Sequence, residues 1–335
     1  MAAVADLDRS QASREIVRRF EGSGYFRVVR TLTEARPIDA LLDEGAVKAA
    51  LQFDPGFADD LARGRTAAIQ VIVDGTDSNT ASVVLAYATR IIAQANREQL
   101  RGSLALRRVA AGGRSLPRAE EPGVELRSRA WYNPDLRSQN FYVPGVLAIL
   151  IMLTLLLMTS MAIVREREIG TMEQLLVSPI RPAELILGKT LPFALIGFFD
   201  VALITTVAVG WFRVPIRGSL WLLLGGTAVY LLPVLGAGLF ISTISRTQQQ
   251  AMMSTFFFFQ PAMLLSGFVF PIANMPEAVQ LLTYLNPLRY YLVIIRGIFL
   301  KGNGLAVLWP QFLALFLLGL AVLAASVARF HKRVA

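Results

Sequence analysis

The stretch that decides the fold is Val146–Val164, which reads VLAILIMLTLLLMTSMAIV. It lies within 27 residues, between Arg137 and Arg165, that carry no charged side chain. The hydrocarbon core of a bilayer is about 30 Å thick, and an α-helix needs roughly 20 apolar residues to cross it. This stretch therefore predicts a membrane-spanning helix over residues 144–164.

Four further apolar stretches follow the first one. Each is long enough to cross a bilayer as a helix, and they predict spans at about residues 187–211, 219–243, 252–272 and 307–329. A soluble protein with buried helices is a poor explanation, because five such stretches within the last 195 residues leave too little polar surface. The sequence therefore predicts an α-helical, polytopic membrane protein with five spans.

The segment 273–301 differs from these spans. It is apolar, but prolines and charged residues interrupt it, and a long regular helix does not continue through such breaks. The residues concerned are Pro271, Pro276, Glu277, Pro287, Arg289, Arg296 and Lys301. We expect two short helices that enter the membrane and return, a re-entrant hairpin whose irregular backbone is satisfied by protein or water.

Charge divides the chain into two parts. Of its 335 residues 54% are hydrophobic and 17% charged, yet residues 1–140 hold 20 of the 33 basic and 18 of the 24 acidic residues. This predicts a charged N-terminal domain over 1–140 and a transmembrane domain over 141–335. The other basic residues lie beside the apolar stretches, so we expect membrane lipid and no nucleic acid as a partner. The absence of cysteine excludes disulfide bonds and thiolate metal sites.

The N-terminal domain alternates strand-like and helix-like stretches. Residues 46–53 and 69–74 are typical of β-strands, being short and apolar. Helices are expected at residues 10–20, with Ser10 as the cap, and at 36–44, 57–63 and 81–106. The alternation predicts a compact α/β domain over about residues 1–75, followed by a helix that leads towards the membrane.

Basic residues near the spans indicate the orientation. If the first span runs inwards, eight Lys and Arg lie in cytoplasmic segments near the spans and five lie outside. The N-terminal domain is then extracytoplasmic. Its first 24 residues are polar and do not read as a signal sequence. Either this orientation is wrong, or a spanning helix belongs ahead of the domain.

Two features of the membrane part are candidates for function. Residues 165–179 read REREIGTMEQLLVSP, alternating charges before apolar residues at helical spacing. This pattern predicts an amphipathic helix along the cytoplasmic face, either an interaction element or a solvated connector. Asp200 is the single charged residue between Lys189 and Arg213, which makes it a functional candidate. The alternatives are a neutral, hydrogen-bonded acid or a pairing with another helix.

No motif for catalysis or metal binding is found in the sequence. It has no GxxxxGK[ST] phosphate loop, no HExxH and no GxSxG. The single histidine, His331, lies in a basic tail, and the run DGTD at 74–77 is typical of a tight turn after a strand. We interpret the chain as non-enzymatic, with no metal site and no cofactor of its own.

These stretches together resemble the membrane subunit, or permease, of type-2 ABC exporters, in the bacterial multidrug-efflux-like subgroup with a large extracytoplasmic domain. The matching residues are 165–179, FRVP at 212–215, ISTIS at 241–245, QQQAM at 248–252, LSGF at 265–268 with Pro271, and LNPLRY at 285–290. In the N-terminal domain DLDRS at 6–10, DPGF at 54–57 and VDGTDSNTA at 73–81 are similar too. The resemblance covers essentially the whole chain.

The resemblance implies a half-transporter with six spans in the bacterial inner membrane, of which the first is expected ahead of Ala2 and is missing from these residues. Two permeases, identical or paralogous, are implied to pair above separate ABC ATPase subunits that bind ATP. The implied export substrates are drugs or other small hydrophobic molecules. A lipid or polysaccharide exporter, and a membrane sensor or receptor outside the ABC class, stay open as alternatives.

The resemblance also assigns roles to residues. The residues implied in coupling to the ATPase are Arg165, Glu166, Arg167, Glu168, Gly170, Thr171, Glu173 and Gln174. The residues implied in an extracytoplasmic gate hairpin are Pro271, Pro276, Asn286, Pro287 and Arg289. Asp200 is expected to serve the translocation pathway or helix pairing.

Overall fold

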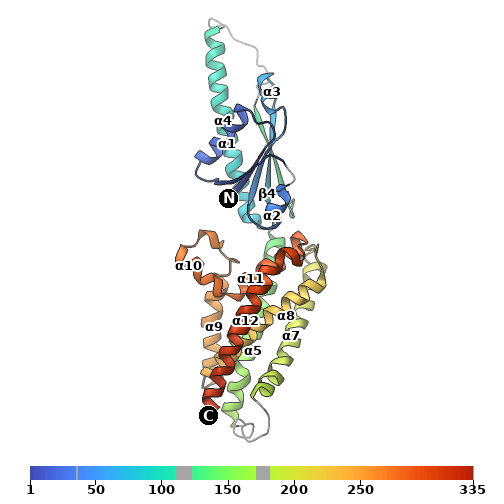
Figure 1. The fold of residues 1–335 in the computed structure, drawn as a ribbon, viewed down its shortest axis with the longest axis vertical. Coiled ribbons are helices and arrows are strands. Elements are labelled where there is room, and N and C mark those ends of the chain that lie inside the picture. The colour runs from blue at the N-terminus through green and yellow to red at the C-terminus, as the bar shows by residue number, and fades with distance from the viewer. Residues whose placement is uncertain (35–36, 111–122, 171–181, 335) are drawn as a thin grey trace. The chain divides into compact units, whose positions relative to one another are not determined.

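A computed structural model describes residues 1–34, 37–110, 123–170 and 182–334. The chain divides into two compact units, Met1–Ser138 and Gln139–Ala335. The first is built around a β-sheet and the second from helices (Figure 1).

The N-terminal unit is built on a five-stranded mixed sheet with the strand order β2-β1-β3-β4-β5. The strands are β1 (Ala2–Asp6), β2 (Val28–Leu32), β3 (Ala49–Phe53), β4 (Ala67–Asp74) and β5 (Val124–Trp131). Strand β1 is parallel to both β2 and β3, whereas β4 is antiparallel to β3 and parallel to β5.

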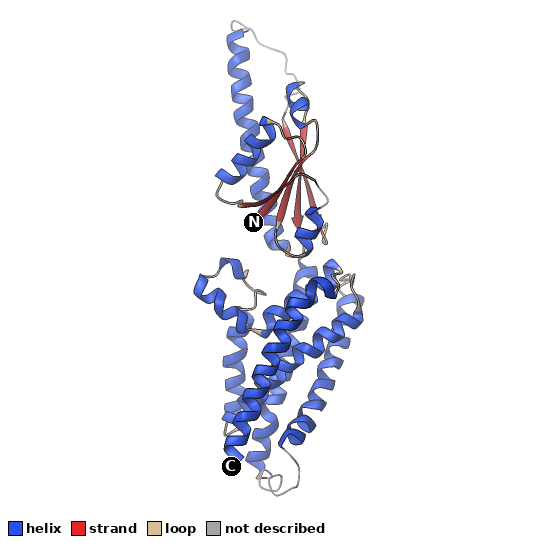
Figure 2. Cartoon of the chain, viewed as in Figure 1, coloured by secondary structure: helices blue, strands red, loops and turns tan. Residues whose placement is uncertain are grey.

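Helices pack on both faces of this sheet (Figure 2). They are α1 (Gln11–Gly22), α3 (Phe57–Ala62) and α4 (Ser78–Ala110) on one face and α2 (Pro37–Asp43) on the other. Side chains alternate between the faces along each strand. In β4, for example, Ile69, Val71 and Val73 join the core under α1, α3 and α4, whereas Ile72 joins the core under α2.

The predicted α/β character of this unit is confirmed. The two expected strands are β3 and β4, and Ser10 caps α1 by accepting a hydrogen bond from the Ser13 amide at 3.1 Å. The expected end of the α/β domain near residue 75 is wrong, because β5 follows α4 and pairs with β4 along its whole length. Strands β1, β2 and β5 were not predicted.

Within residues 139–170 and 182–334, the second unit contains five long helices. They are α5 (Ser138–Ile169), α7 (Pro182–Gly210), α8 (Leu220–Ile244), α9 (Gln248–Leu264) and α12 (Leu305–Val334). Among the described residues, four segments are long and apolar enough to cross a membrane: Ser138–Ile169, Leu187–Gly210, Leu220–Ile244 and Leu305–Ala328. The unit is therefore that of a multi-pass membrane protein.

The helix at the predicted fourth span, residues 252–272, is shorter than expected. Helix α9 has 17 residues, or about 26 Å at 1.5 Å per residue, so it falls short of the bilayer core by itself. The span was predicted to continue to residue 272, but α9 ends at Leu264. The turn that follows contains Gly267 with a φ of +82°, a left-handed conformation that breaks a helix.

Short helices fill the segment between α9 and α12. They are the 3₁₀ turns Ile272–Asn274 and Thr283–Leu285, α10 (Glu277–Leu282), α11 (Pro287–Arg296) and a π-helical turn at Gly297–Lys301. Helices α10 and α11 are the two short helices expected within 273–301.

Buried aromatic side chains join three helices of this unit. The rings of Tyr230 on α8 and Tyr291 on α11 stack with centroids 4.0 Å apart. The Tyr230 hydroxyl donates to the carbonyl of Ala148 on α5 at 3.2 Å, and the hydroxyls of Tyr291 and Thr227 share a hydrogen bond of 2.9 Å. Both tyrosines are fully buried, so α5, α8 and α11 form one packed group.

Candidate functional site

The charged run after the first span continues the helix of that span. Residues 165–169 are the last five of α5, and Gly170, with a φ of +84°, ends the helix. The amphipathic helix predicted to start at Arg165 therefore does not begin there. Thr171, Glu173 and Gln174 lie outside the described residues.

Glu166 joins this end of α5 to the start of α7. The Lys189 Nζ lies 2.8 Å from the Glu166 Oε1, and it also donates to the carbonyl of Ala162 at 3.1 Å. The two side chains are only 21% and 31% exposed, for Lys189 and Glu166 respectively, so water screens the pair less than it does a surface pair. The ion pair thus fastens α7 to α5 across the connector between them.

Arg167 and Glu168 fasten the same end of α5 to the turn between α8 and α9. The Arg167 guanidinium donates to the carbonyl of Ser245 at 2.8 Å. The Glu168 carboxylate accepts from the backbone amide of Gln248 at 2.9 Å and from the Gln248 side chain. Because Gln248 is the first residue of α9, this carboxylate also interacts favourably with the positive end of that helix. Three charged residues therefore hold three helices together at one end of the unit.

Packing just before the charged run brings α5 and α8 close together. The Oγ of Ser242, which is fully buried on α8, lies 3.1 Å from the amide nitrogen of Ile163. At Gly238, a Cβ would lie 2.7 Å from the Thr159 side chain, so no larger residue fits without movement. The ion pair of Glu166 and the hydrogen bond of Arg167 thus connect helices that are already in contact.

Arg165 is the exception among these charges. Its side chain is exposed, and it forms no hydrogen bond or ion pair with any part of the chain that the structure describes. Its exposed side chain thus differs from those of residues 166–168, which contact other parts of the described chain.

Sequence reasoning missed the partners of this run. Lys189 and Gln248 were not singled out for a role in it, because each lies far along the chain from the residue it binds. A signal existed for Lys189, since it is the single cation at the start of an otherwise apolar span.

Asp200 lies in the middle of α7, and its side chain is half-buried. The structure shows no hydrogen bond or ion pair for it within residues 1–34, 37–110, 123–170 and 182–334. It is not brought together with the charged end of α5 or with the hairpin residues.

Asn286 positions the hairpin. Its side chain caps α11 by accepting from the Leu288 amide at 3.1 Å, and it donates to the carbonyl of Ala262 on α9 at 2.6 Å. Pro287 is the first residue of α11, where its missing N–H costs nothing. The junction of the hairpin with α9 is therefore well defined.

The other predicted hairpin residues shape its turns. Pro271 and Pro276 stand directly before the 3₁₀ turn and α10. The Arg289 guanidinium lies 3.9 Å from the centre of the Tyr284 ring and donates to the Thr283 hydroxyl. These residues lie within one segment, and Arg289 ties α11 to the 3₁₀ turn Thr283–Leu285 that follows α10.

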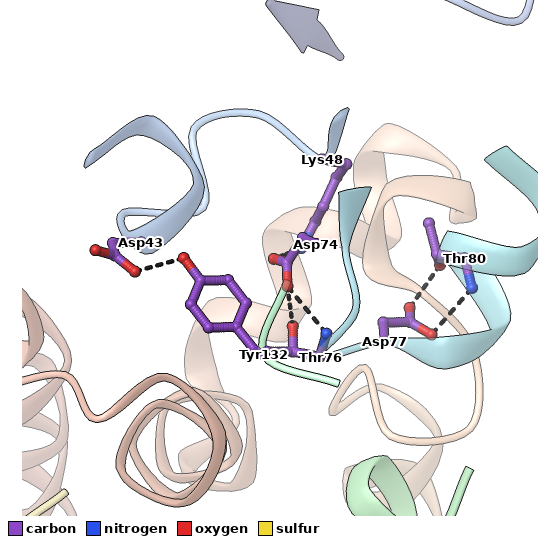
Figure 3. A network of polar contacts seen from close by, with 7 residues as sticks. All are labelled: Asp43, Lys48, Asp74, Thr76, Asp77, Thr80 and Tyr132. Carbon is purple, nitrogen blue, oxygen red and sulfur yellow. Dashed lines mark hydrogen bonds and ion pairs between the residues drawn. The ribbon is translucent and has the colours of Figure 1, made fainter. Parts of the chain in front are cut away.

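A polar network in the N-terminal unit accounts for the DGTD run (Figure 3). Asp74, at the end of β4, accepts from the amide of Thr76 at 3.1 Å and lies 3.6 Å from the Lys48 Nζ. Asp77 accepts from the Thr80 amide at 3.1 Å, as a cap does at the start of a helix. The run therefore forms a tight turn between β4 and α4, as predicted.

Comparison with known proteins agrees with this architecture along nearly the whole chain. Residues 2–328 match the family described as ABC-2 family transporter protein. The chain is 32% identical over 332 residues to "Probable multidrug ABC transporter permease YbhR" of Escherichia coli K12, covering 99% of this chain and 86% of that protein. It is 34% identical over 320 residues to "Probable multidrug ABC transporter permease YbhS" of the same organism, covering 94% and 80%.

A third relative has a different name. It is "Inner membrane transport permease YhhJ" of Escherichia coli K12, 33% identical over 335 residues, with 99% of this chain and 85% of that protein covered. Matches of this length include the sheet unit as well as the helices. The chain therefore belongs to the ABC-2 family of transporter proteins, as a membrane permease subunit.

Proposed function

We propose that this permease exports small hydrophobic molecules or drugs from the bacterial cytoplasm when it is paired with a second permease in the inner membrane. Family membership makes the chain a transport subunit without an ATPase site of its own, working with separate ABC ATPase subunits. The ATPase partners bind the ATP, and this chain needs no cofactor. The drug substrates are suggested by the names of YbhR and YbhS, and the membrane by that of YhhJ.

One observation carries the proposed mechanism. The charged end of α5 is fastened to α7 through Glu166 and to the α8–α9 turn through Arg167 and Glu168. A force applied to this end therefore reaches several helices at once and not α5 alone. Closure of the ATPase subunits on ATP binding supplies that force, and the spans reorient around the export pathway.

The predicted coupling residues divide into two groups in this mechanism. Glu166, Arg167 and Glu168 act inside the permease, where they hold the helices to be moved. Arg165 is exposed and faces the ATPase. Gly170 ends α5. Thr171, Glu173 and Gln174, which lie outside the described residues, are assigned to contact with the ATPase in this proposal.

The hairpin closes the outer end of the pathway in this proposal. Five spans then cross the membrane, with α9 completed by the residues up to 271. Support comes from the hydrogen bond of Asn286 to Ala262, which ties the hairpin to α9. A movement of α9, whose other end is held by Glu168, is thereby passed to the hairpin.

Co-purification tests the proposal. The permease is expressed from its native locus, extracted in mild detergent and probed for an ATPase subunit. A stoichiometric ATPase that hydrolyses ATP faster in the presence of a lipophilic drug is the expected result. If no ATPase co-purifies with the folded permease in any of the mild detergents, the coupling role of residues 165–174 is wrong.

A further inference from the structure

Asp200 is placed at about half the depth of the membrane. It is 13 residues from Leu187 and ten from Gly210, the ends of the apolar segment of α7, which correspond to about 20 Å and 15 Å along the helix. An ionisable group at this depth is costly unless a counter-charge, a hydrogen bond or water compensates it.

The side of α7 on which Asp200 lies is neither fully packed nor fully exposed. Gly197, Val201 and Ala208 form the buried stripe of the helix, and at Gly197 a Cβ would meet Leu155 of α5 and Leu231 of α8 at 2.9 Å. At 100° per residue, Asp200 stands about 60° from Gly197, at the edge of this stripe. Its half-buried carboxylate is therefore accessible to a small molecule from the side of α7 that is not packed against α5 and α8.

The long helices of the described membrane unit offer Asp200 no cation at that depth. By sequence, no Lys, Arg or His occurs within 139–164, 190–211, 220–244, 248–264 or 305–328. The two arginines of α11 lie elsewhere, Arg289 over the Tyr284 ring at 3.9 Å and Arg296 over the Phe141 ring at 3.8 Å. A second permease of identical sequence brings these same residues to the dimer.

We infer that the counter-charge of Asp200 is the transported molecule, and that the substrates of this permease are lipophilic cations. This inference rests on the proposed function as an exporter. An organic cation with a large apolar body partitions into the membrane, where its charge lacks a partner just as Asp200 does. Bringing the two together satisfies both charges, and their attraction is stronger than in water because the effective dielectric constant is lower.

Tetraphenylphosphonium and tetraphenylborate provide a matched pair of probes, because they have nearly the same size and shape but opposite charge. The full exporter with its ATPase is reconstituted in proteoliposomes, and equilibrium binding of each labelled ion is measured. Empty liposomes correct for partitioning into lipid. The variants are Asp200→Asn, Asp200→Leu and, as the charge-preserving control, Asp200→Glu.

The wild-type exporter is expected to bind tetraphenylphosphonium and not tetraphenylborate. Asp200→Asn and Asp200→Leu should each raise the Kd for tetraphenylphosphonium at least about tenfold, and Asp200→Glu should change it less than about threefold. Stimulation of ATPase activity by tetraphenylphosphonium should fall strongly in Asp200→Asn and Asp200→Leu and little in Asp200→Glu.

Three outcomes would overturn the inference. In the first, the wild type binds the two ions with equal affinity. In the second, Asp200→Asn binds tetraphenylphosphonium with the same Kd as the wild type, which indicates that Asp200 is a neutral, hydrogen-bonded acid. In the third, the complex dissociates in Asp200→Leu but not in Asp200→Asn, which indicates helix pairing. If the ATPase stays bound, each of these outcomes refutes the cation inference but leaves the proposed exporter function standing. If the wild-type permease does not retain the ATPase, the proposed exporter function itself is refuted.

Discussion

Replacing Lys189 by methionine removes the cation that fastens α7 to the charged end of α5. Methionine keeps most of the length and apolar volume of the side chain, so the change acts mainly on the charge. Glu166 is left without the ammonium group that lies 2.8 Å from its Oε1. We expect a less stable membrane unit and weaker coupling of ATP hydrolysis to export.

The size of the effect follows from the partial burial of the pair. Exposed ion pairs contribute about 0–1 kcal/mol, whereas breaking a buried one costs about 3–5 kcal/mol. With side chains 21% and 31% exposed, the pair lies between these limits. We therefore expect a coupling energy of about 1–2 kcal/mol between Glu166 and Lys189.

A double-mutant cycle measures this energy directly. Lys189→Met, Glu166→Gln and the double variant are compared by their free energies of unfolding in mixed micelles, and by the number of substrate molecules exported per ATP. The double variant should be about as stable as either single variant. Arg165→Gln is the matched control, since it removes a charge from the same turn of α5 without breaking a contact seen in the described chain.

The reasoning is refuted if the coupling energy is below about 0.3 kcal/mol, because the effects of mutations at two independent sites add to within about that value. It is also refuted if Lys189→Met lowers stability but leaves export per ATP unchanged, because the pair would then serve folding alone. Arg165→Gln should leave stability unchanged and weaken binding of the ATPase.

Three further predictions concern other parts of the chain. Asn286→Ala removes the cap of α11 and the bond to Ala262; it should cost about 1–3 kcal/mol and make residues 272–285 more sensitive to protease. Tyr291→Phe removes the hydrogen bond to Thr227 but keeps the ring stack, and should lower the free energy of unfolding by about 1 kcal/mol. Burial, more than hydrogen bonding, raises the pKa of the Tyr132 hydroxyl above its usual value of 10.0. The free energy of unfolding of the N-terminal unit should therefore stay constant below about pH 10 and fall as the pH rises further. Tyr132→Phe should remove that fall, which circular dichroism would measure.

The membrane part was predictable because its signal is local. An uncharged stretch of about 20 residues has few alternatives to a spanning helix, and four such helices are found. The prolines at 271, 276 and 287 likewise mark the breaks of the hairpin by their own geometry. The length of α9 was predicted less well, because hydropathy continues past Leu264 although the left-handed Gly267 has ended the helix.

The N-terminal sheet was only half predictable, because strand pairing is not local. Strand β5 carries polar residues on its open face and begins 14 residues after the end of the 33-residue α4, so its pairing with β4 has no signal nearby. Strand β1 is a short run of Ala and Val that is buried by the sheet around it. In both, tertiary contacts decide the structure more than intrinsic propensity does.

The candidate site shows the same limit. Its charges were found from their unusual pattern after a span, but alternating Arg and Glu residues do not reveal which of them are already bound. The ion pair of Glu166 with Lys189 and the contact of Glu168 with Gln248 join residues 23 and 80 positions apart. In the proposed mechanism, these residues therefore hold together the helices that the ATPase moves and do not themselves contact the ATPase.

Site-directed photocrosslinking tests most directly whether the end of α5 meets the ATPase. The chain contains no cysteine, so Arg165→Cys provides one unique thiol that can be labelled with a benzophenone maleimide. Ser138→Cys, exposed at the other end of α5, is the matched control. We predict an ATPase crosslink on illumination from the labelled Arg165→Cys protein and none from Ser138→Cys; an active exporter that gives no crosslink at Arg165→Cys, or equal crosslinks at both positions, would contradict the account.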